Sequence, residues 1–165
     1  MTTYYVGTGG NDSNSGLTWA LRKLTLNGVE DTPIQAGDTV YVGAGTYRET
    51  LTCDVSGTAE AGSITYIGDY DGSHTDGTGG VVRITGSDND TSYARGIQIN
   101  ANAKNYRTFK YFYLDGVSGS SYSVNVNGTN FTLEKCYLIS SFRAINLFYT
   151  TIASCTISDC VIMSR

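Results

Sequence analysis

Three segments in the last third of the chain decide the fold: Phe109-Lys110-Tyr111-Phe112-Tyr113-Leu114, Leu133-Glu134-Lys135-Cys136-Tyr137-Leu138 and Ile152-Ala153-Ser154-Cys155-Thr156-Ile157. In each segment the first, fourth and sixth residues are apolar. We align them in three rows: Phe109, Leu133 and Ile152; Phe112, Cys136 and Cys155; Leu114, Leu138 and Ile157. The offsets are 24 and then 19 residues in every row. A repeat of this length without helical periodicity is typical of a solenoid, whose stacked coils bury a continuous core.

A shorter alternating segment precedes each of these three: Gly96-Ile97-Gln98-Ile99-Asn100, Ser123-Val124-Asn125-Val126-Asn127 and Ala144-Ile145-Asn146-Leu147-Phe148. Alternation with a period of two predicts strands with one buried and one wet face. An ordinary β-sandwich is the alternative. We expect Asn100 and Asn127 to stack as a pair at neighbouring corners, where Asn tolerates the left-handed conformation. We also expect Cys136 and Cys155 to be reduced core residues.

The composition limits the classes of protein. The 165 residues include 20 Gly and 13 Tyr, with 16% charged residues and a formal net charge of -4. A chain of this length forms a single domain, 1–165, with a real core. The acidic balance argues against a nucleic-acid partner, which needs clustered Lys and Arg. No apolar run is long enough to span a membrane, and no secretory signal is visible. The four cysteines match no zinc spacing.

Residues 1–35 are expected to hold an N-terminal strand, a loop and a capping helix, and residues 36–165 the coils. The helix is predicted over Thr18–Val29, where it would cover the open first coil. In the loop that follows Tyr4-Tyr5-Val6, Asp12 and Asn14 are interpreted as turn-forming residues rather than calcium ligands. The segment 69–77 contains His74, the one histidine, and three aspartates. We interpret it as a flexible loop, with a metal site as the alternative.

A family resemblance covers nearly the whole chain. Residues 37–42 read Gly-Asp-Thr-Val-Tyr-Val, residues 45–51 read Gly-Thr-Tyr-Arg-Glu-Thr-Leu, and both follow a Tyr-Tyr-Val strand and a Gly-Asn-Asp loop. This arrangement resembles the N-terminal part of right-handed parallel β-helix proteins of the pectin-lyase-like superfamily. The resemblance implies an all-β fold. It leaves function open, because that superfamily includes polysaccharide lyases, glycoside hydrolases, phage tailspikes and non-catalytic virion proteins.

Pairing the strands gives about five coils: 39–51, 64–84, 97–114, 124–138 and 145–157. No capping element is recognised before Arg165. We therefore expect either a fragment of a longer β-helix, truncated at its C-terminal end, or an end that another chain covers.

The outward positions hold few candidates for chemistry. Three outward rows are expected: Gln98, Asn125 and Asn146; Lys110, Glu134 and Ala153; Tyr113, Tyr137 and Thr156. None contains the paired carboxylates of a glycoside hydrolase or the calcium-binding acids of a lyase. Asp115 and Arg143 are placed in turns without an acidic partner. We assign no catalytic residue, no metal ligand and no cofactor. Tyr113 and Tyr137 are the candidate carbohydrate- or partner-binding residues, since aromatic rings contact sugars and protein partners. The alternative is a pair of tyrosines under a neighbouring loop.

Two hypotheses on function follow. The first is a non-catalytic structural or receptor-binding β-helix of a phage virion, in a tail spike, a fibre or a head decoration. Its partners would be other copies of the chain, as a trimer, or other virion proteins, with a polysaccharide as a further ligand. The second is the N-terminal part of a secreted polysaccharide lyase or glycoside hydrolase. The expected location is the virion or the extracellular space, with neither nucleic acid nor membrane as a partner.

Overall fold

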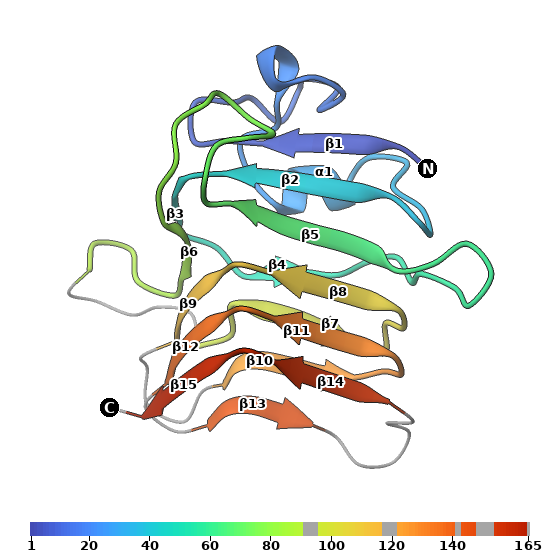
Figure 1. Ribbon diagram of the computed structural model, residues 1–165, viewed down its shortest axis with the longest axis vertical. Helices are drawn as coiled ribbons and strands as arrows, with labels where there is room; N and C mark the ends of the chain where they lie inside the picture. The colour runs from blue at the N-terminus through green and yellow to red at the C-terminus, as the bar shows by residue number, and fades with distance from the viewer. Residues whose placement is uncertain (91–95, 117–121, 141–142, 148–153, 165) are drawn as a thin grey trace.

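Three parallel β-sheets stack their strands along one axis and form a parallel β-helix (Figure 1). This computed structural model describes residues 1–90, 96–116, 122–140, 143–147 and 154–164. Every pair of neighbouring strands in the three sheets is parallel. The all-β solenoid expected from the sequence is therefore confirmed.

The chain visits the three sheets in turn as it climbs from one coil to the next. Sheet A contains β1 (Thr3–Val6), β2 (Thr39–Gly43), β5 (Ile64–Asp69), β8 (Arg107–Lys110), β11 (Phe131–Glu134) and β14 (Cys155–Ser158). Sheet B contains β3 (Gly45–Tyr47), β6 (Val82–Thr85), β9 (Tyr113–Gly116), β12 (Tyr137–Ser140) and β15 (Val161–Ser164). Sheet C contains β4 (Leu51–Thr52), β7 (Ile99–Asn102), β10 (Tyr122–Asn127) and β13 (Arg143–Leu147).

Like residues lie above like residues inside and outside the coils. Inside, the Tyr66 ring stacks on its register partner Phe109 at a centroid distance of 5.4 Å, and Phe131, which lies diagonal to Phe109 on the next strand, contacts it at 5.6 Å. Outside, one row of sheet A is threonine in every strand: Thr3, Thr39, Thr65, Thr108, Thr132 and Thr156. β-branched side chains suit such a row, because they pack well against neighbours on the pleated surface of a sheet.

The register differs from the expected one at the third segment. Leu133 pairs with Phe109, as predicted, but its other partner is Ile157 rather than Ile152. The second offset is thus 24 residues, like the first, and not 19. Ile152 and Ala153 lie outside the described residues.

The corrected offset separates the two cysteines that we aligned. Cys155 pairs with Phe131, and the residue next to Cys136 in the stack is Cys160, whose Sγ accepts a hydrogen bond from the Cys136 amide at 3.4 Å. The stacking of Cys136 on Cys155 was wrong. All four cysteines are free thiols in the structure.

The asparagine row also has different members. Asn100 pairs with Asn125, not Asn127. The Asn125 amide donates to Asn100 at 3.1 Å, and the Asn146 amide donates to Asn125 at 2.9 Å. A ladder of side-chain amides therefore does run along the axis, but it lies within sheet C rather than at a corner. Gln98, which we placed in this outward row, is fully buried instead.

The single helix expected over Thr18–Val29 is replaced by two short turns. The 3₁₀ turn η1 (Trp19–Leu21) is capped by the Thr18 hydroxyl, and α1 (Asn27–Glu30) follows after an extended stretch. Between them Lys23 forms a parallel bridge with Val6 at the free edge of β1. An extended stretch can pair with that edge, whereas a continuous helix could not. Neither turn is long or apolar enough to cross a membrane, and they are the only helices in the described ranges.

The turn α1 covers the upper edge of sheet C with its side chains. The Asn27 side chain accepts from the Thr52 amide at 2.9 Å and donates to the Thr50 carbonyl at 2.7 Å. Glu30 accepts from the Asp54 amide at 2.9 Å. One backbone group of β4 and two beside it thereby find partners without another strand.

The aspartate-rich loop after β5 folds back onto sheet A. The His74 ring stacks on Tyr41 at 4.1 Å, and its backbone amide donates to the buried Asp69 at 2.9 Å. Within the described residues, no group of three or more His, Cys, Asp or Glu side chains gathers as a cation site.

Candidate functional site

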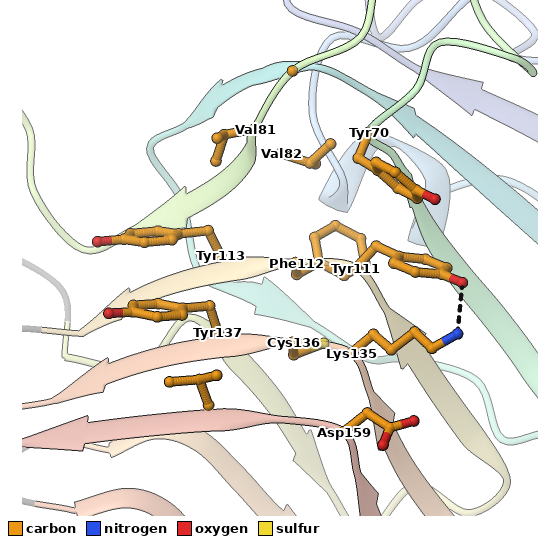
Figure 2. Close-up of a pocket in the computed structure, with 12 residues that line it drawn as sticks. Tyr70, Val81, Val82, Tyr111, Phe112, Tyr113, Lys135, Cys136, Tyr137 and Asp159 are labelled. Atoms are coloured by element: carbon orange, nitrogen blue, oxygen red, sulfur yellow. Dashed lines mark hydrogen bonds between the residues drawn. The ribbon is translucent and has the colours of Figure 1, made fainter.

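A groove of about 530 Å³ lies where sheet A turns into sheet B (Figure 2). Its volume is in the range of small-molecule sites, about 300–1,000 Å³. The buried side chains of Val82, Phe112 and Cys136 form its floor. Above the floor Val81 is 62% exposed, so an apolar surface is open to solvent here. Exposed apolar surface of this kind marks sites of interaction.

Tyr113 and Tyr137 form one wall of the groove. They pair in register on β9 and β12, and their rings lie 5.0 Å apart at an angle of 6°. The sequence thus correctly placed these two residues in one outward row. The third member of that row is Val161, not Thr156, because of the 24-residue offset. Since each ring covers one face of the other, the row presents ring edges rather than a free flat face, and the hydroxyl ends of both rings point away from the floor (Figure 2). The Tyr137 hydroxyl donates to the Met163 sulfur, which lies outside the groove lining.

Tyr70 and Tyr111 form the opposite wall. Their ring centroids lie 4.9 Å apart at an angle of 37°, and Tyr70 is 54% exposed. Lys135 lies below Tyr111, with its Nζ atom 5.4 Å from the ring centroid and 3.4 Å from the phenol oxygen. This contact with Tyr111 raises the pKa of Lys135, and the nearby Glu134 and Asp159 add to the effect. Lys135 is therefore a cation at neutral pH.

Three corner residues beside the groove share an unusual backbone conformation. Tyr111, Lys135 and Asp159 follow one another at intervals of 24 residues and have φ angles of 63°, 53° and 53°. The left-handed region costs a residue with a Cβ about 1–2 kcal/mol relative to the right-handed one, and Gly would avoid that cost. Strained residues of this kind cluster at functional sites. Corners outside the groove share this conformation, with φ angles of 55°, 50° and 56° at Ala103, Tyr106 and Asn130, so it does not by itself single out the residues beside the groove.

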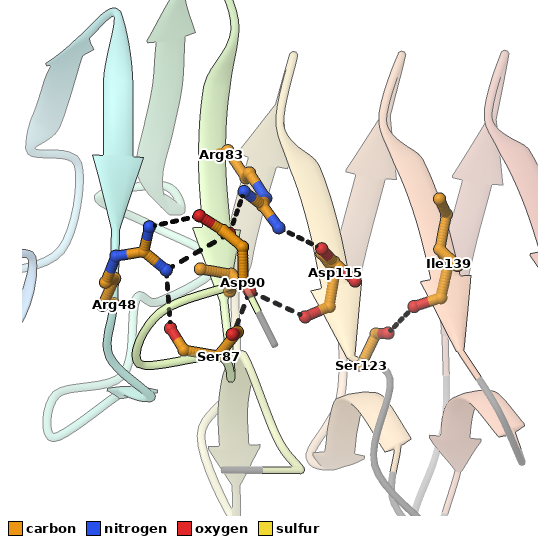
Figure 3. Close-up of polar contacts among 8 residues, drawn as sticks. Arg48, Arg83, Ser87, Asp90, Asp115, Ser123 and Ile139 are labelled. Atoms are coloured by element: carbon orange, nitrogen blue, oxygen red, sulfur yellow. Dashed lines mark hydrogen bonds and ion pairs between the residues drawn. The ribbon is translucent and has the colours of Figure 1, made fainter. Parts of the chain in front are cut away.

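A network of charges lies next to Tyr113 on sheet B (Figure 3). Arg83, the neighbour of Tyr113 in the sheet, bonds Asp90 at 2.7 Å and also bonds Asp115. Arg48 bonds Asp90 at 2.7 Å and the Ser87 carbonyl at 2.9 Å. Asp115, which we expected in a turn without an acidic partner, is instead a nearly buried residue of β9, and Arg83 links it to a second acid, Asp90.

This network lacks the properties of a hydrolase acid pair. One of the two carboxyl groups in such a pair has to carry a proton at neutral pH. Here hydrogen bonds from Arg48 and Arg83 lower the pKa of Asp90 to about 2. Arg83 also bonds both carboxylates, so the two are joined by a cation. The network holds residues 87–90 against sheet B, and we assign it no chemistry.

Glu49 is an acid whose raised pKa alone would suggest a catalytic role. Burial raises its pKa, which is a common property of catalytic acids. Its two oxygens, however, accept from the Leu26 amide at 2.9 Å and from the Asn27 amide and side chain at 3.1 and 2.7 Å. Glu49 therefore caps the start of α1, which is a structural role.

Sequence reasoning found one wall of the groove and missed the other. Tyr70, Tyr111, Lys135 and Asp159 were not selected. The signal for three of them was present, because Tyr111, Lys135 and Asp159 share the 24-residue spacing. Tyr70 had no such signal, since it enters the groove from the loop after β5.

No protein-family model matches the sequence, and no curated protein matches it. Solved structures do match. The GH136 lacto-N-biosidase from Eubacterium ramulus superposes with TM-scores of 0.67 for the selenomethionine derivative and 0.66 for the native protein. The identities are 17% and 15%, and the match covers 99% of this chain and 34% of the enzyme.

A rhamnogalacturonan lyase superposes with a TM-score of 0.60 at 16% identity, over 98% of this chain and 58% of the lyase. At these identities the likeness shows the fold alone. The chain spans about a third of the biosidase and somewhat over half of the lyase.

Proposed function

We propose that this β-helix belongs to a carbohydrate-active protein and that its groove binds sugar. This is the second of the two hypotheses drawn from the sequence, the one that names a polysaccharide lyase or glycoside hydrolase. The observation that carries it is the groove itself, with tyrosine pairs on both walls and an apolar floor. The structural neighbours described above are carbohydrate-active enzymes, which favours this hypothesis over a virion protein.

The chemistry of sugar recognition fits this groove. Sugar rings present C–H groups and hydroxyls together, and amphipathic aromatic residues contact both. Tyr70 offers an exposed ring, and the Tyr113–Tyr137 row offers ring edges.

We propose binding here without a catalytic residue. Among the described residues that line the groove, Asp159 is the one carboxylate. Hydrolysis of a glycosidic bond requires two in most families.

The test is binding of a panel of neutral and acidic oligosaccharides and polysaccharides, measured by calorimetry and by affinity electrophoresis. Tyr70→Ala and Tyr137→Ala should each weaken binding. An aromatic contact is worth about 0.5–1.5 kcal/mol, which corresponds to a roughly two- to twelve-fold loss of affinity.

Tyr5→Ala is the matched control. Tyr5 is also an outward tyrosine stacked on another, at 6.1 Å from Tyr41, but it lies outside the groove. This variant should bind as the unmodified chain does. If no saccharide binds, or if Tyr5→Ala weakens binding as much as Tyr70→Ala does, the proposed function is wrong.

A further inference from the structure

We propose that His74 is a positioning residue for the groove, because it holds in place the loop that carries Tyr70. This inference rests on the proposed function and concerns how an exposed wall of that site is kept in position. The β5–β6 loop, residues 70–81, rises from the end of β5 past β2 and descends again to β6 (Figure 1). It supplies Tyr70, Gly80 and Val81 to the groove.

The two ends of the β5–β6 loop are joined beside the groove. The Gly80 amide donates to the Tyr70 carbonyl at 2.7 Å, and the Tyr70 ring packs on Tyr111. Tyr70 is 54% exposed, so much of its side chain has no protein to pack against (Figure 2). The position of Tyr70 in the wall therefore depends on the path of the loop as well as on Tyr111.

The loop has few side chains that hold it to the coils. Gly occupies positions 72, 77, 79 and 80, and between Tyr70 and Val81 the sequence contains one ring, that of His74. Glycine-rich backbone loses more conformational entropy on ordering than other backbone does. An anchor in the middle of the loop offsets that cost, and His74 is placed to supply it.

His74 anchors the loop through its backbone and through its ring. Its amide donates at 2.9 Å to the carboxylate of Asp69, which is buried. Its imidazole stacks on Tyr41 of β2, with the ring centroids 4.1 Å apart and an angle of 11° between the planes. The backbone bond is open to any residue at this position except proline, whereas the stack needs a flat ring. The identity of the residue therefore matters through its contact with Tyr41.

The stack sets the size of the expected effect. An aromatic contact of this kind shifts an equilibrium roughly two- to twelve-fold. Without the imidazole, the population of chains with a displaced loop should rise by that factor, and affinity falls with the fraction of chains that is competent to bind. His74 lies outside the groove lining, so its loss should weaken binding no more than the loss of Tyr70 itself does.

The experiment has one readout without ligand and one with ligand. Without ligand, hydrogen exchange of the Gly80 amide, measured by NMR, reports the opening of its bond to Tyr70. With ligand, calorimetry gives dissociation constants for cellotetraose, N-acetyllactosamine and tetragalacturonate, which sample neutral and acidic sugars. His74→Ala should speed the exchange of Gly80 roughly two- to twelve-fold. It should also weaken the binding of each probe that binds, by at most the loss that Tyr70→Ala causes.

Three variants assign the effect to the stack. His74→Phe keeps a flat ring and should restore both the exchange rate and the affinity. Tyr41→Ala removes the other ring and should behave as His74→Ala does. Tyr5→Ala is the control, because Tyr5 stacks on the same Tyr41 ring at 6.1 Å but belongs to β1 rather than to the loop. It should change neither readout.

A double-mutant cycle tests whether His74 acts through Tyr70. In the Tyr70→Ala chain, which already lacks the ring, His74→Ala should cause no further loss of affinity. If the two losses multiply instead, His74 does not act through Tyr70 and the inference is wrong.

The outcomes separate this inference from the proposed function. If a saccharide binds but His74→Ala leaves its affinity unchanged, or if His74→Phe fails to restore it, the inference is wrong and the proposed function remains. An unchanged exchange rate of Gly80 in His74→Ala refutes the inference whether or not a saccharide binds. If no saccharide binds, both fall.

Discussion

The buried ion pair between Glu30 and Arg107 gives a sharp test of how the N-terminal segment is joined to the coils. The two residues lie 77 positions apart, and their side chains are 1% and 0% exposed. Glu30 accepts bonds from Arg107, from the Tyr66 hydroxyl at 2.5 Å and from the Asp54 amide at 2.9 Å. The pair thus connects α1 to sheet A across the interior of the solenoid.

We expect Glu30→Gln to destabilise the fold strongly. The substitution keeps the shape of the side chain but leaves the Arg107 guanidinium buried without a counter-charge. Removal of one partner from a buried ion pair costs about 3–5 kcal/mol. For a chain of this size that corresponds to a fall in Tm of roughly 6–20 °C.

The assay is urea denaturation followed by circular dichroism, with Glu60→Gln as the control. Glu60 is exposed, so its substitution should change the free energy of unfolding by less than about 0.5 kcal/mol. Glu30→Met combined with Arg107→Met should recover part of the loss, because it removes both charges from the interior. A loss below about 1 kcal/mol for Glu30→Gln would refute the reasoning, since it would mean that water or another group neutralises Arg107.

Three further perturbations test other parts of the structure. Asn125→Ala removes the middle of the amide ladder, so it should lower the free energy of unfolding by about 1–3 kcal/mol in urea titrations. Thr52→Ala, at the exposed end of the same row, is the control and should cost little. Lys135→Gly should stabilise the fold by about 0.5–1 kcal/mol, because it relieves a left-handed residue, and a loss of stability there would contradict the strain argument. Burial raises the pKa of both the Cys53 and the Cys136 thiols to about 12, from an unfolded value near 9. Above pH 9 the unfolded chain therefore releases these protons and the folded chain does not, so stability should fall between pH 9 and pH 12, by up to about 2 kcal/mol per thiol at pH 10.5. Cys53→Ala should reduce that slope in denaturation measured at several pH values, and an unchanged slope would contradict the assignment.

The sequence was sufficient for the solenoid but not for its register at the C-terminal end. Residues 152–157 and 157–162 both read Ile-x-x-Cys-x-Ile, so the apolar pattern fits an offset of 19 or of 24 equally well. The structure selects 24. The outward threonine row distinguishes the two offsets, because Thr108, Thr132 and Thr156 follow one another at intervals of 24 residues. Apolar residues alone are a weak guide to register, since they interchange freely in a core.

In the N-terminal segment, the spacing of apolar residues predicted a helix that the structure does not contain. Leu17, Leu21, Leu24 and Gly28 have helical spacing, yet the three leucines are 41–51% exposed and the continuous helix does not form. Pairing with β1 and capping of β4 both require extended or tightly turned backbone, and these tertiary demands override a weak helical pattern. Local periodicity could not reveal them, because the edges that need cover are formed by residues elsewhere in the chain.

The groove illustrates why half of a site can be read from a repeat and half cannot. Tyr113 and Tyr137 stand at equivalent positions of two coils, and stacking places them together whatever the turns do. Tyr111, Lys135 and Asp159 stand at a corner whose left-handed conformation no sequence pattern indicated, because none of the three is Gly or Asn. Three coils in succession thus keep a costly residue at one corner, each with a different side chain. A second corner, at Tyr106 and Asn130, has the same conformation and the same 24-residue spacing outside the groove, again with two different side chains. The geometry of the coil therefore sets the left-handed backbone at these corners, and the side chain at each is free to differ.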